Sequence, residues 1–364
     1  MSVASIKNQN ASDWKNEAGP IKKYFNDITV TEIMINRYDK IFIERKGILE
    51  EVEGKFDNPE HLVRFVQALA VNVGRDLNRK NPFMDARLPD GSRVNIVIPP
   101  VSVDNPMVTI RKFSPMMVSY TNLLSYGAFD EKILYFINQA VVARQNIIIS
   151  GGTGSGKTTI LNLLSQFIPA KERVVTLEDT VELQMNVKNV VRMECRSFLS
   201  DSHFEIKDLL RNALRMRPDR LIIGEVRGGE AFDMLIAMNT GHEGSMSTLH
   251  SNSAFDALRR IEAMVLRGTQ DIPIQTVKDD IAKTINIIIQ TERFSDGSRR
   301  ISEVVEVDGR TTQDYTINKI FEFNELDKKF TSLGYVPKFV TDSRNPRIKF
   351  PQGFFEPDHV IKLS

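Results

Sequence analysis

Hydrophobic and polar positions follow two different patterns along the chain, and the first pattern occupies residues 21–112. Short apolar runs at 32–35 and 40–43 predict two strands joined by a polar turn. Asn58 suits an N-cap and Pro59 a first turn, so a helix is expected after them. Its apolar positions recur at helical spacing: Leu62, Phe65, Val66 and Leu69.

A hairpin and a further strand complete this first pattern. Residues 84–88 and 93–98 flank the turn Pro89-Asp90-Gly91, in which glycine suits a positive φ. Residues 108–112 form a short apolar strand between prolines. We therefore expect a small α+β domain at 21–112.

The second pattern of hydrophobic and polar positions extends through residues 128–364. Apolar runs at 146–150, 173–178, 220–225 and 245–250 predict strands, and helical stretches such as 158–167 and 230–238 separate them. This alternation is typical of a mostly parallel sheet with helices on both faces. The fold class predicted is α/β, with the larger C-terminal domain preceded by the smaller α+β domain.

Two segments outside these domains lack apolar periodicity. Residues 1–20 are rich in Asn, Ser, Lys and Ala, and we expect a mobile tail there. Residues 113–127 follow several prolines, and we expect the interdomain linker there.

Composition narrows the class of protein. The 48 basic and 47 acidic residues nearly balance, so no nucleic-acid partner is expected. The only cysteine, Cys195, can form no intrachain disulfide, which favours a reducing cytosol. No apolar run approaches the roughly 20 residues that span a bilayer. We therefore expect membrane association only through partners.

A glycine-rich segment between a predicted strand and a predicted helix carries the strongest chemical signal. It reads Gly151, Gly152, Thr153, Gly154, Ser155, Gly156, Lys157 and Thr158, which satisfies G-x-x-x-x-G-K-[ST]. In such a loop, backbone N–H groups converge on phosphate oxygens and the lysine reaches the β- and γ-phosphates. Thr158 supplies a hydroxyl for Mg²⁺. The sequence therefore predicts that the chain binds and hydrolyses ATP.

Carboxylates stand at the carboxyl ends of two further predicted strands. Glu178 and Asp179 end one, and Glu225 ends the other. Ligands of open α/β sheets bind at that edge. The position that commonly holds a Mg²⁺-linked aspartate is Gly224, so Glu225 is left to polarise the attacking water. Glu178 or Asp179 is expected to take part in metal binding or water ordering.

Two histidines, His242 and His250, bracket a glycine-serine turn and a strand. Metal binding by this pair is not expected, because the chain lacks the remaining ligands of a zinc site. A neutral imidazole that donates to a phosphate oxygen or to a catalytic carboxylate is the favoured role.

Together these segments resemble a known family. The phosphate loop extended to Thr159, residues 176–179, residues 215–231 and residues 237–245 look like the Walker A, Asp box, Walker B and His box of type II/IV secretion ATPases. Within that superfamily the chain most resembles the CpaF/TadA branch, the motors of tight-adherence pili. The resemblance covers about residues 85–307.

The resemblance implies a RecA-like C-terminal domain and a homo-hexamer of two-domain subunits. It also implies ATP between the two domains and an inner-membrane platform protein as partner, at the cytoplasmic face of the membrane. By motif match it assigns ATP and Mg²⁺ to Lys157 and Thr158, the Asp-box carboxylate to Glu178, the Walker B glutamate to Glu225, and the His-box pair to His242 and His250.

Arginines from the N-terminal domain are also expected to reach the γ-phosphate in this family. Arg87, Arg93 and Arg111 match the typical segments, while Arg217 and Arg227 are weaker candidates. Such an arginine would neutralise transition-state charge and make hydrolysis depend on domain closure.

Two alternatives stay open at this point. One is a RecA-like nucleic-acid translocase, against which stand the balanced charge and the absence of a basic and aromatic tract. The other is an assembly module that binds nucleotide with little turnover, against which stands Glu225. The direction of work, pilus extension or retraction, is not written in the sequence.

Overall fold

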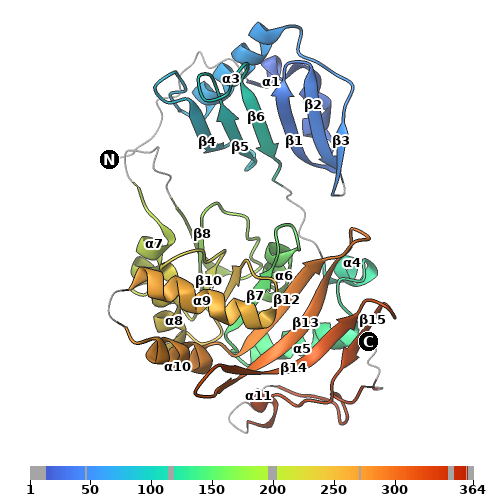
Figure 1. Cartoon of the computed structure of the whole chain (residues 1–364), viewed down its shortest axis with the longest axis vertical. Coiled ribbons are helices and arrows are strands. Elements are labelled where there is room, and N and C mark those ends of the chain that lie inside the picture. Colours follow the sequence, from blue (N-terminus) through green and yellow to red (C-terminus); the bar gives the residue numbers. More distant parts are fainter. Residues whose placement is uncertain are drawn as a thin grey trace. The chain divides into compact units, whose positions relative to one another are not determined.

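The structure is a computed structural model that describes residues 14–45, 47–113, 119–195, 203–269, 272–342, 348–357 and 359. The chain divides into two compact units, residues 1–116 and 117–364. Figure 1 colours both along the sequence.

The N-terminal unit is built on a six-stranded antiparallel sheet, ordered β3-β2-β1-β6-β5-β4. Its strands are β1 (Val30–Arg37), β2 (Lys40–Arg45), β3 (Ile48–Glu51), β4 (Phe83–Arg87), β5 (Arg93–Val97) and β6 (Met107–Arg111). Its helices are α1 (Trp14–Glu17), α2 (Lys22–Asn26) and α3 (Pro59–Asn72), with a 3₁₀ turn at Gly19–Ile21. The expected α+β architecture is confirmed.

Local sequence explains where α3 begins. The Asn58 side chain accepts a hydrogen bond from the His61 backbone N–H at 2.8 Å, as an N-cap does. Leu62, Phe65 and Leu69 are fully buried against the sheet. The predicted helix is therefore correct in both its start and its apolar face.

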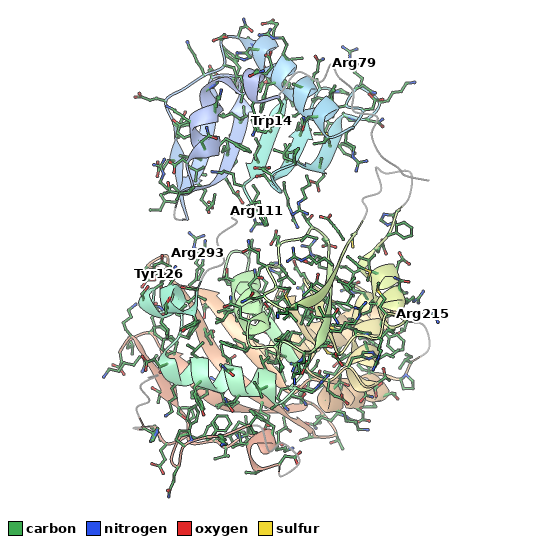
Figure 2. All side chains as sticks on the ribbon, turned by 180° about the vertical axis from the view of Figure 1, so that it is seen from behind. Trp14, Arg79, Arg111, Tyr126, Arg215 and Arg293 are labelled. Atoms are coloured by element: carbon green, nitrogen blue, oxygen red, sulfur yellow. The ribbon has the colours of Figure 1, made fainter. Side chains whose placement is uncertain are left out.

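The expected tail at 1–20 extends too far. Trp14 is 3% exposed and packs against Phe25 and Phe65 inside the N-terminal unit (Figure 2). Ala18 is also buried. Burial of this large aromatic ring stabilises the folded form of the segment, although the neighbouring residues in the sequence are polar. Residues 1–13 lie outside the described residues.

The C-terminal unit carries a nine-stranded sheet in the order β15-β14-β13-β12-β7-β11-β10-β8-β9. Its strands are β7 (Ile147–Gly151), β8 (Arg173–Glu178), β9 (Asn189–Glu194), β10 (Arg220–Ile223), β11 (Met246–Leu249), β12 (Ile287–Arg293), β13 (Arg299–Arg310), β14 (Tyr315–Asn324) and β15 (Lys329–Ser332). Pairing is parallel from β12 through β7 to β9.

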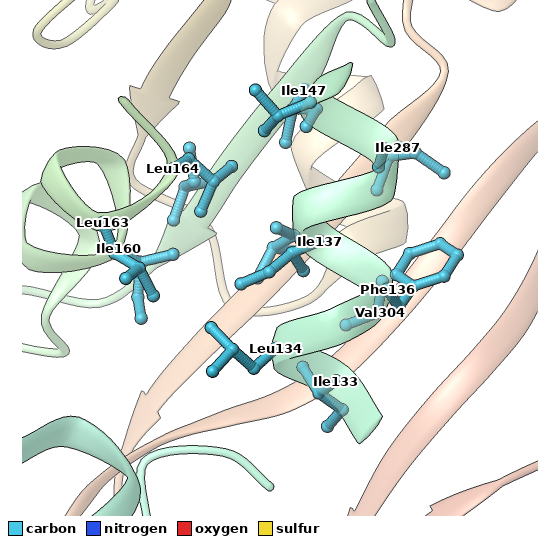
Figure 3. Close-up of a cluster of buried hydrophobic side chains, with 14 of the residues drawn as sticks. Ile133, Leu134, Phe136, Ile137, Ile147, Ile160, Leu163, Leu164, Ile287 and Val304 are labelled. Atoms are coloured by element: carbon cyan, nitrogen blue, oxygen red, sulfur yellow. The ribbon is translucent and has the colours of Figure 1, made fainter. Parts of the chain in front are cut away.

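Helices cover both faces of this sheet, as expected. They are α4 (Tyr120–Ser125), α5 (Glu131–Val142), α6 (Lys157–Ser165), α7 (Ile206–Ala213), α8 (Glu230–Asn239), α9 (Ala254–Gly268), α10 (Ile274–Thr284) and α11 (Lys338–Thr341). Ile147 and Ile149 face a core shared with α5 and α6, shown in Figure 3. Ile148 faces the opposite core, shared with α7 to α10. A strand buried on both faces needs such a continuous apolar run.

Two features of this unit differ from expectation. Strands β12 to β15 form an antiparallel meander that the sequence pattern did not predict. Helix α4 lies within the expected linker at 113–127, and its Leu123 is buried in the core of this unit. Ordered structure therefore begins before residue 128.

In the described part of the chain, no helix is both long enough and apolar enough to cross a membrane.

Candidate nucleotide site

The glycine-rich loop joins β7 to α6 at the carboxyl edge of the parallel strands. Gly151, Gly154 and Gly156 have φ values of 156°, 70° and 99°, which side chains with a Cβ rarely adopt. A Cβ on Gly151 would also collide with the Thr291 carbonyl and, at 2.6 Å, with Ser155 Oγ. Gly152 and Thr153 are exposed, while Thr158 and Thr159 lie half-buried in the first turn of α6. The predicted phosphate loop is thus framed by a strand and a helix N-terminus.

Lys157 is held at the base of this loop. Its Nζ donates to the carbonyls of Gly151 at 3.0 Å and Gly152 at 2.8 Å, and lies 3.3 Å from His250 Nδ1. Burial lowers the pKa of Lys157, and Arg227 adds to this, while Glu225 opposes it. The ammonium is therefore poorly solvated and ready to exchange backbone carbonyls for phosphate oxygens.

His250 connects the lysine to Glu225. Its Nε2 lies 2.9 Å from Glu225 Oε1. Burial lowers the pKa of His250, as do the charges of Lys157 and Arg227. A neutral ring accepts at Nδ1 from the ammonium, which can only donate, and then carries its proton on Nε2 toward Glu225.

Arg227 holds the other oxygen of Glu225. Its Nη2 donates to Glu225 Oε2 at 2.7 Å, and its Nη1 lies 3.1 Å from Asp179 Oδ2. Burial disfavours ionisation of Glu225, but Arg227, followed by His250 and Lys157, outweighs it and lowers the pKa of that carboxyl. Glu225 is therefore an anion at neutral pH, held at Oε2 by Arg227, while its buried Oε1 lies close to His250 Nε2 but makes no hydrogen bond among the described residues.

Glu178 lies deeper, at the end of β8. It is 2% exposed, and its Oε2 accepts from the backbone N–H groups of Glu182 at 2.7 Å and Leu183 at 2.8 Å. Its buried Oε1 has no hydrogen-bond partner among the described residues. Burial raises the pKa of Glu178. The absence of a side chain at Gly224 makes room for the Glu178 side chain, since a Cβ at Gly224 would lie 3.2 Å from Glu178 Cγ.

The two histidines do not form a pair within one chain. His242 precedes β11 and His250 follows it, so they lie at opposite edges of the sheet. His242 Nδ1 lies 3.1 Å from the Ala237 carbonyl of α8, away from Glu225. His250 therefore lies beside Lys157 and Glu225, whereas His242 lies at the other end of β11.

The three arginines of the N-terminal unit come together in one row. Arg87 pairs with Arg93 between β4 and β5, and Arg93 pairs with Arg111 between β5 and β6. The Arg87 guanidinium lies 5.8 Å from the Phe113 ring centre. Arg111, at the end of β6 in Figure 2, lies 3.7 Å from Glu32. Candidates separated in sequence thus become cross-strand neighbours.

The residues of the C-terminal unit fit a nucleotide with Mg²⁺. Positive-φ glycines, the N-terminus of α6 and a desolvated ammonium suit a chain of phosphates. No group of three or more His, Cys, Asp or Glu gathers as a metal site among the described residues. The Thr158 hydroxyl in the first turn of α6 and the buried, partnerless Glu178 Oε1 are oxygen atoms of the kind that suits Mg²⁺ held mainly by nucleotide and water.

Sequence reasoning missed the roles of two residues. Arg227 was ranked only as a weak candidate to touch phosphate, whereas it clamps Glu225. Thr291 was not singled out, although its Oγ1 lies 2.8 Å from Ser155 Oγ in the phosphate loop. The signal available was a pair of polar residues, Gln290 and Thr291, directly after the apolar run at 285–289.

Comparisons with known proteins found a matching family model and similar proteins. The family model described as type II/IV secretion system protein matches residues 14–318. The conjugal transfer protein TrbB of Rhizobium radiobacter is 34% identical over 304 residues, covering 82% of this chain and 90% of TrbB.

Two further similarities differ in extent. An uncharacterised protein of Methanocaldococcus jannaschii is 40% identical over 239 residues, which are 63% of this chain but only 33% of that protein. The X-ray structure of the Yersinia pseudotuberculosis ATPase DotB matches with a TM-score of 0.57 at 19% identity, covering 77% of this chain and 76% of DotB. That likeness concerns the fold alone.

Proposed function

The chain belongs to the type II/IV secretion system protein family, and we propose that it hydrolyses ATP as the motor of a secretion or pilus machine. The observation that carries this proposal is the connected set Lys157, His250, Glu225 and Arg227 beside the phosphate loop. A loop that only bound nucleotide would not need an oriented, ionised carboxylate at its γ-phosphate end.

In the proposed mechanism the loop amides and Lys157 bind the β- and γ-phosphates of ATP. Glu225 orients a water and accepts its proton as the water oxygen attacks the γ-phosphorus and the β–γ bridging oxygen leaves with ADP. His250 lies between Lys157 and Glu225 Oε1, and Arg227 keeps the carboxyl anionic. Mg²⁺, held by Thr158 with Glu178 ordering its water, would neutralise phosphate charge.

The arginine row would complete the reaction. One or more of Arg87, Arg93 and Arg111 would stabilise charge on the γ-phosphate in the transition state, from the same subunit or from a neighbour. Hydrolysis would then require assembly, and the assembly we propose is a homo-hexamer.

At the finest level we propose a tight-adherence pilus motor of the CpaF/TadA branch. It would act on an inner-membrane platform protein at the cytoplasmic face of that membrane. The ordered motifs from Gly151 to Ser245 support this assignment. A host strain that lacks the chain should lose its pili; a loss of DNA transfer with pili intact would assign the motor to conjugation instead.

The first experiment compares wild type with Glu225→Gln in steady-state phosphate release with Mg²⁺. Glutamine keeps the shape but cannot accept the proton, so turnover should fall about 100-fold or more. Affinity for a fluorescent ATP analogue should change less than about threefold.

Equal turnover in wild type and Glu225→Gln would refute the role given to Glu225. Nucleotide binding without turnover in the wild type, even with a platform protein present, would favour an assembly module. Stimulation by DNA with a steep salt dependence would favour a nucleic-acid translocase.

A further inference from the structure

Strand β12 is placed to control the geometry of the phosphate loop. It pairs in parallel with β7, so that Gln290 faces Ser150 and Thr291 faces Gly151, the first residue of the loop. Gln290 is 4% exposed and Thr291 is 1% exposed. Polar side chains buried to this degree are usually committed to specific hydrogen bonds.

Thr291 links two parts of the loop. Its hydroxyl donates to the Ser150 carbonyl at 3.0 Å, so its oxygen is free to accept from Ser155 Oγ at 2.8 Å. Ser155 is itself 3% exposed. This relay fixes the middle of the loop to its start, across a contact between residues 136 positions apart.

Gln290 makes a second link, on the other face of the strand. Its side-chain carbonyl accepts from Ser150 Oγ, and its Nε2 donates to the Ser251 carbonyl at 3.3 Å. Ser251 directly follows His250. Gln290 therefore ties the strand that carries the phosphate loop to the turn that carries the histidine.

We propose that Gln290 and Thr291 are positioning residues of the nucleotide site: Thr291 sets the loop for binding phosphates, and Gln290 sets His250 against Glu225 for turnover. The inference rests on the proposed ATPase function. It assigns the two residues different effects, because one contacts the loop and the other reaches the histidine turn.

The test uses the full-length protein with Mg²⁺ and a fluorescent ATP analogue. Thr291→Val keeps the shape and removes the hydroxyl, so the Kd and the KM for ATP should rise about tenfold, with kcat changing less than about threefold. Thr291→Ser retains the hydroxyl and should restore both constants to near wild type. Gln290→Met should instead lower kcat about tenfold and leave KM nearly unchanged.

A double-mutant cycle tests the relay itself. Ser155→Ala removes the donor, so Thr291→Val combined with Ser155→Ala should weaken binding no more than Thr291→Val alone, which already lacks this hydrogen bond. If Thr291→Val does not fold, Ser155→Ala decides the point, because it breaks the same hydrogen bond from the loop side.

Several results would overturn the proposal. One is that Thr291→Ser raises Kd and KM as much as Thr291→Val does. Another is that the losses of binding free energy in the double-mutant cycle are additive. A third is that the variants have lower melting temperatures while KM and kcat are unchanged. A wild type that binds no nucleotide would instead refute the proposed function. Wild-type binding with unaltered variants would refute only this inference.

Discussion

Arg227 lowers the pKa of Glu225, the carboxylate proposed to be catalytic. Burial alone would favour the protonated form of Glu225, and the hydrogen bond and charge of Arg227 reverse that preference. Asp179 holds the other arm of the guanidinium, so the cation is fixed as well as charged. A planar fork suits this double contact better than an ammonium does.

Removal of Arg227 should therefore move the pH dependence of hydrolysis. The lowered pKa of Glu225 keeps the base ionised, so activity is lost only as pH falls through that lowered value. In Arg227→Gln the hydrogen bond and the charge that oppose burial are lost, so the pKa of Glu225 rises and the acid limb of kcat/KM should shift to higher pH, with Arg227→Lys shifting it less. The measurement is a pH–rate profile for each variant.

Arg259 provides the control for that experiment. It forms an exposed ion pair with Asp314, away from the nucleotide site. Arg259→Gln should leave the acid limb in place. An acid limb that is identical in wild type and Arg227→Gln would contradict the role given to Arg227.

At the residue scale the sequence was informative wherever one short segment carries the chemistry. The phosphate loop, Glu178 and Glu225 are found from motif and strand end. The relay through Thr291 could not be, because it joins residues 136 positions apart. Arg227 is only two residues from Glu225, but the sequence does not show which way its side chain turns, and its second contact, Asp179, lies on another strand. The roles of His242 and His250 stay predictions.

Helices α8 and α9 contact each other through glycine. Gly229, before α8, lies so close to Gly268, at the end of α9, that a Cβ on Gly229 would come within 2.6 Å of the Gly268 Cα. The obstacle is backbone, which cannot rotate away as a side chain can. This contact brings together α8 and α9, two of the four helices that pack on this face of the sheet.

Gly268→Ala should force those helices apart. We expect a loss of about 1–3 kcal/mol in the free energy of unfolding, the usual cost of overpacking. Urea unfolding followed by circular dichroism measures it. The neighbouring exposed residue offers the control, since Arg267→Ala should change stability by less than about 0.5 kcal/mol. Equal stability of the two variants would show that the helices can separate without cost.

At the element scale, apolar periodicity predicted the parallel strands β7, β8, β10 and β11 to within one or two residues, but it did not predict β9. The meander β12 to β15 was missed even though Asp296-Gly297 is a strong turn signal and Asp296 accepts from the Ser298 N–H at 2.9 Å. A register shift in β12 and the continuous burial of 304–307 in β13 interrupt the alternation that marks a strand.

The whole molecule divides its candidate chemistry between two units. The phosphate loop and carboxylates belong to residues 117–364, and the arginine row belongs to residues 1–116. The two-domain organisation was predicted from the change in the pattern of hydrophobic and polar positions. The hexamer was predicted only from the family resemblance. No periodicity within one chain encodes which subunit an arginine serves.

Mixing two inactive variants can identify that subunit. Glu225→Gln lacks the base, and a variant with Arg87, Arg93 and Arg111 all changed to Gln lacks the row. If the arginines act on a neighbour, mixed assemblies contain some complete sites and should recover several per cent or more of wild-type phosphate release. Arginines that act within their own subunit would give no recovery, provided that size-exclusion chromatography confirms mixed assemblies.

The register of the arginine row also bears on how the protein should be handled. The three arginines stand on adjacent strands, and Glu32 lies 3.7 Å from the last of them, Arg111. Multivalent oxyanions bind such a row better than chloride does, because they bridge several guanidinium groups at once. Sulfate or phosphate buffers will thus act as competitors at the very surface proposed to meet the γ-phosphate. In those buffers the measured kcat/KM for ATP hydrolysis would be too low, so chloride buffers are the appropriate medium.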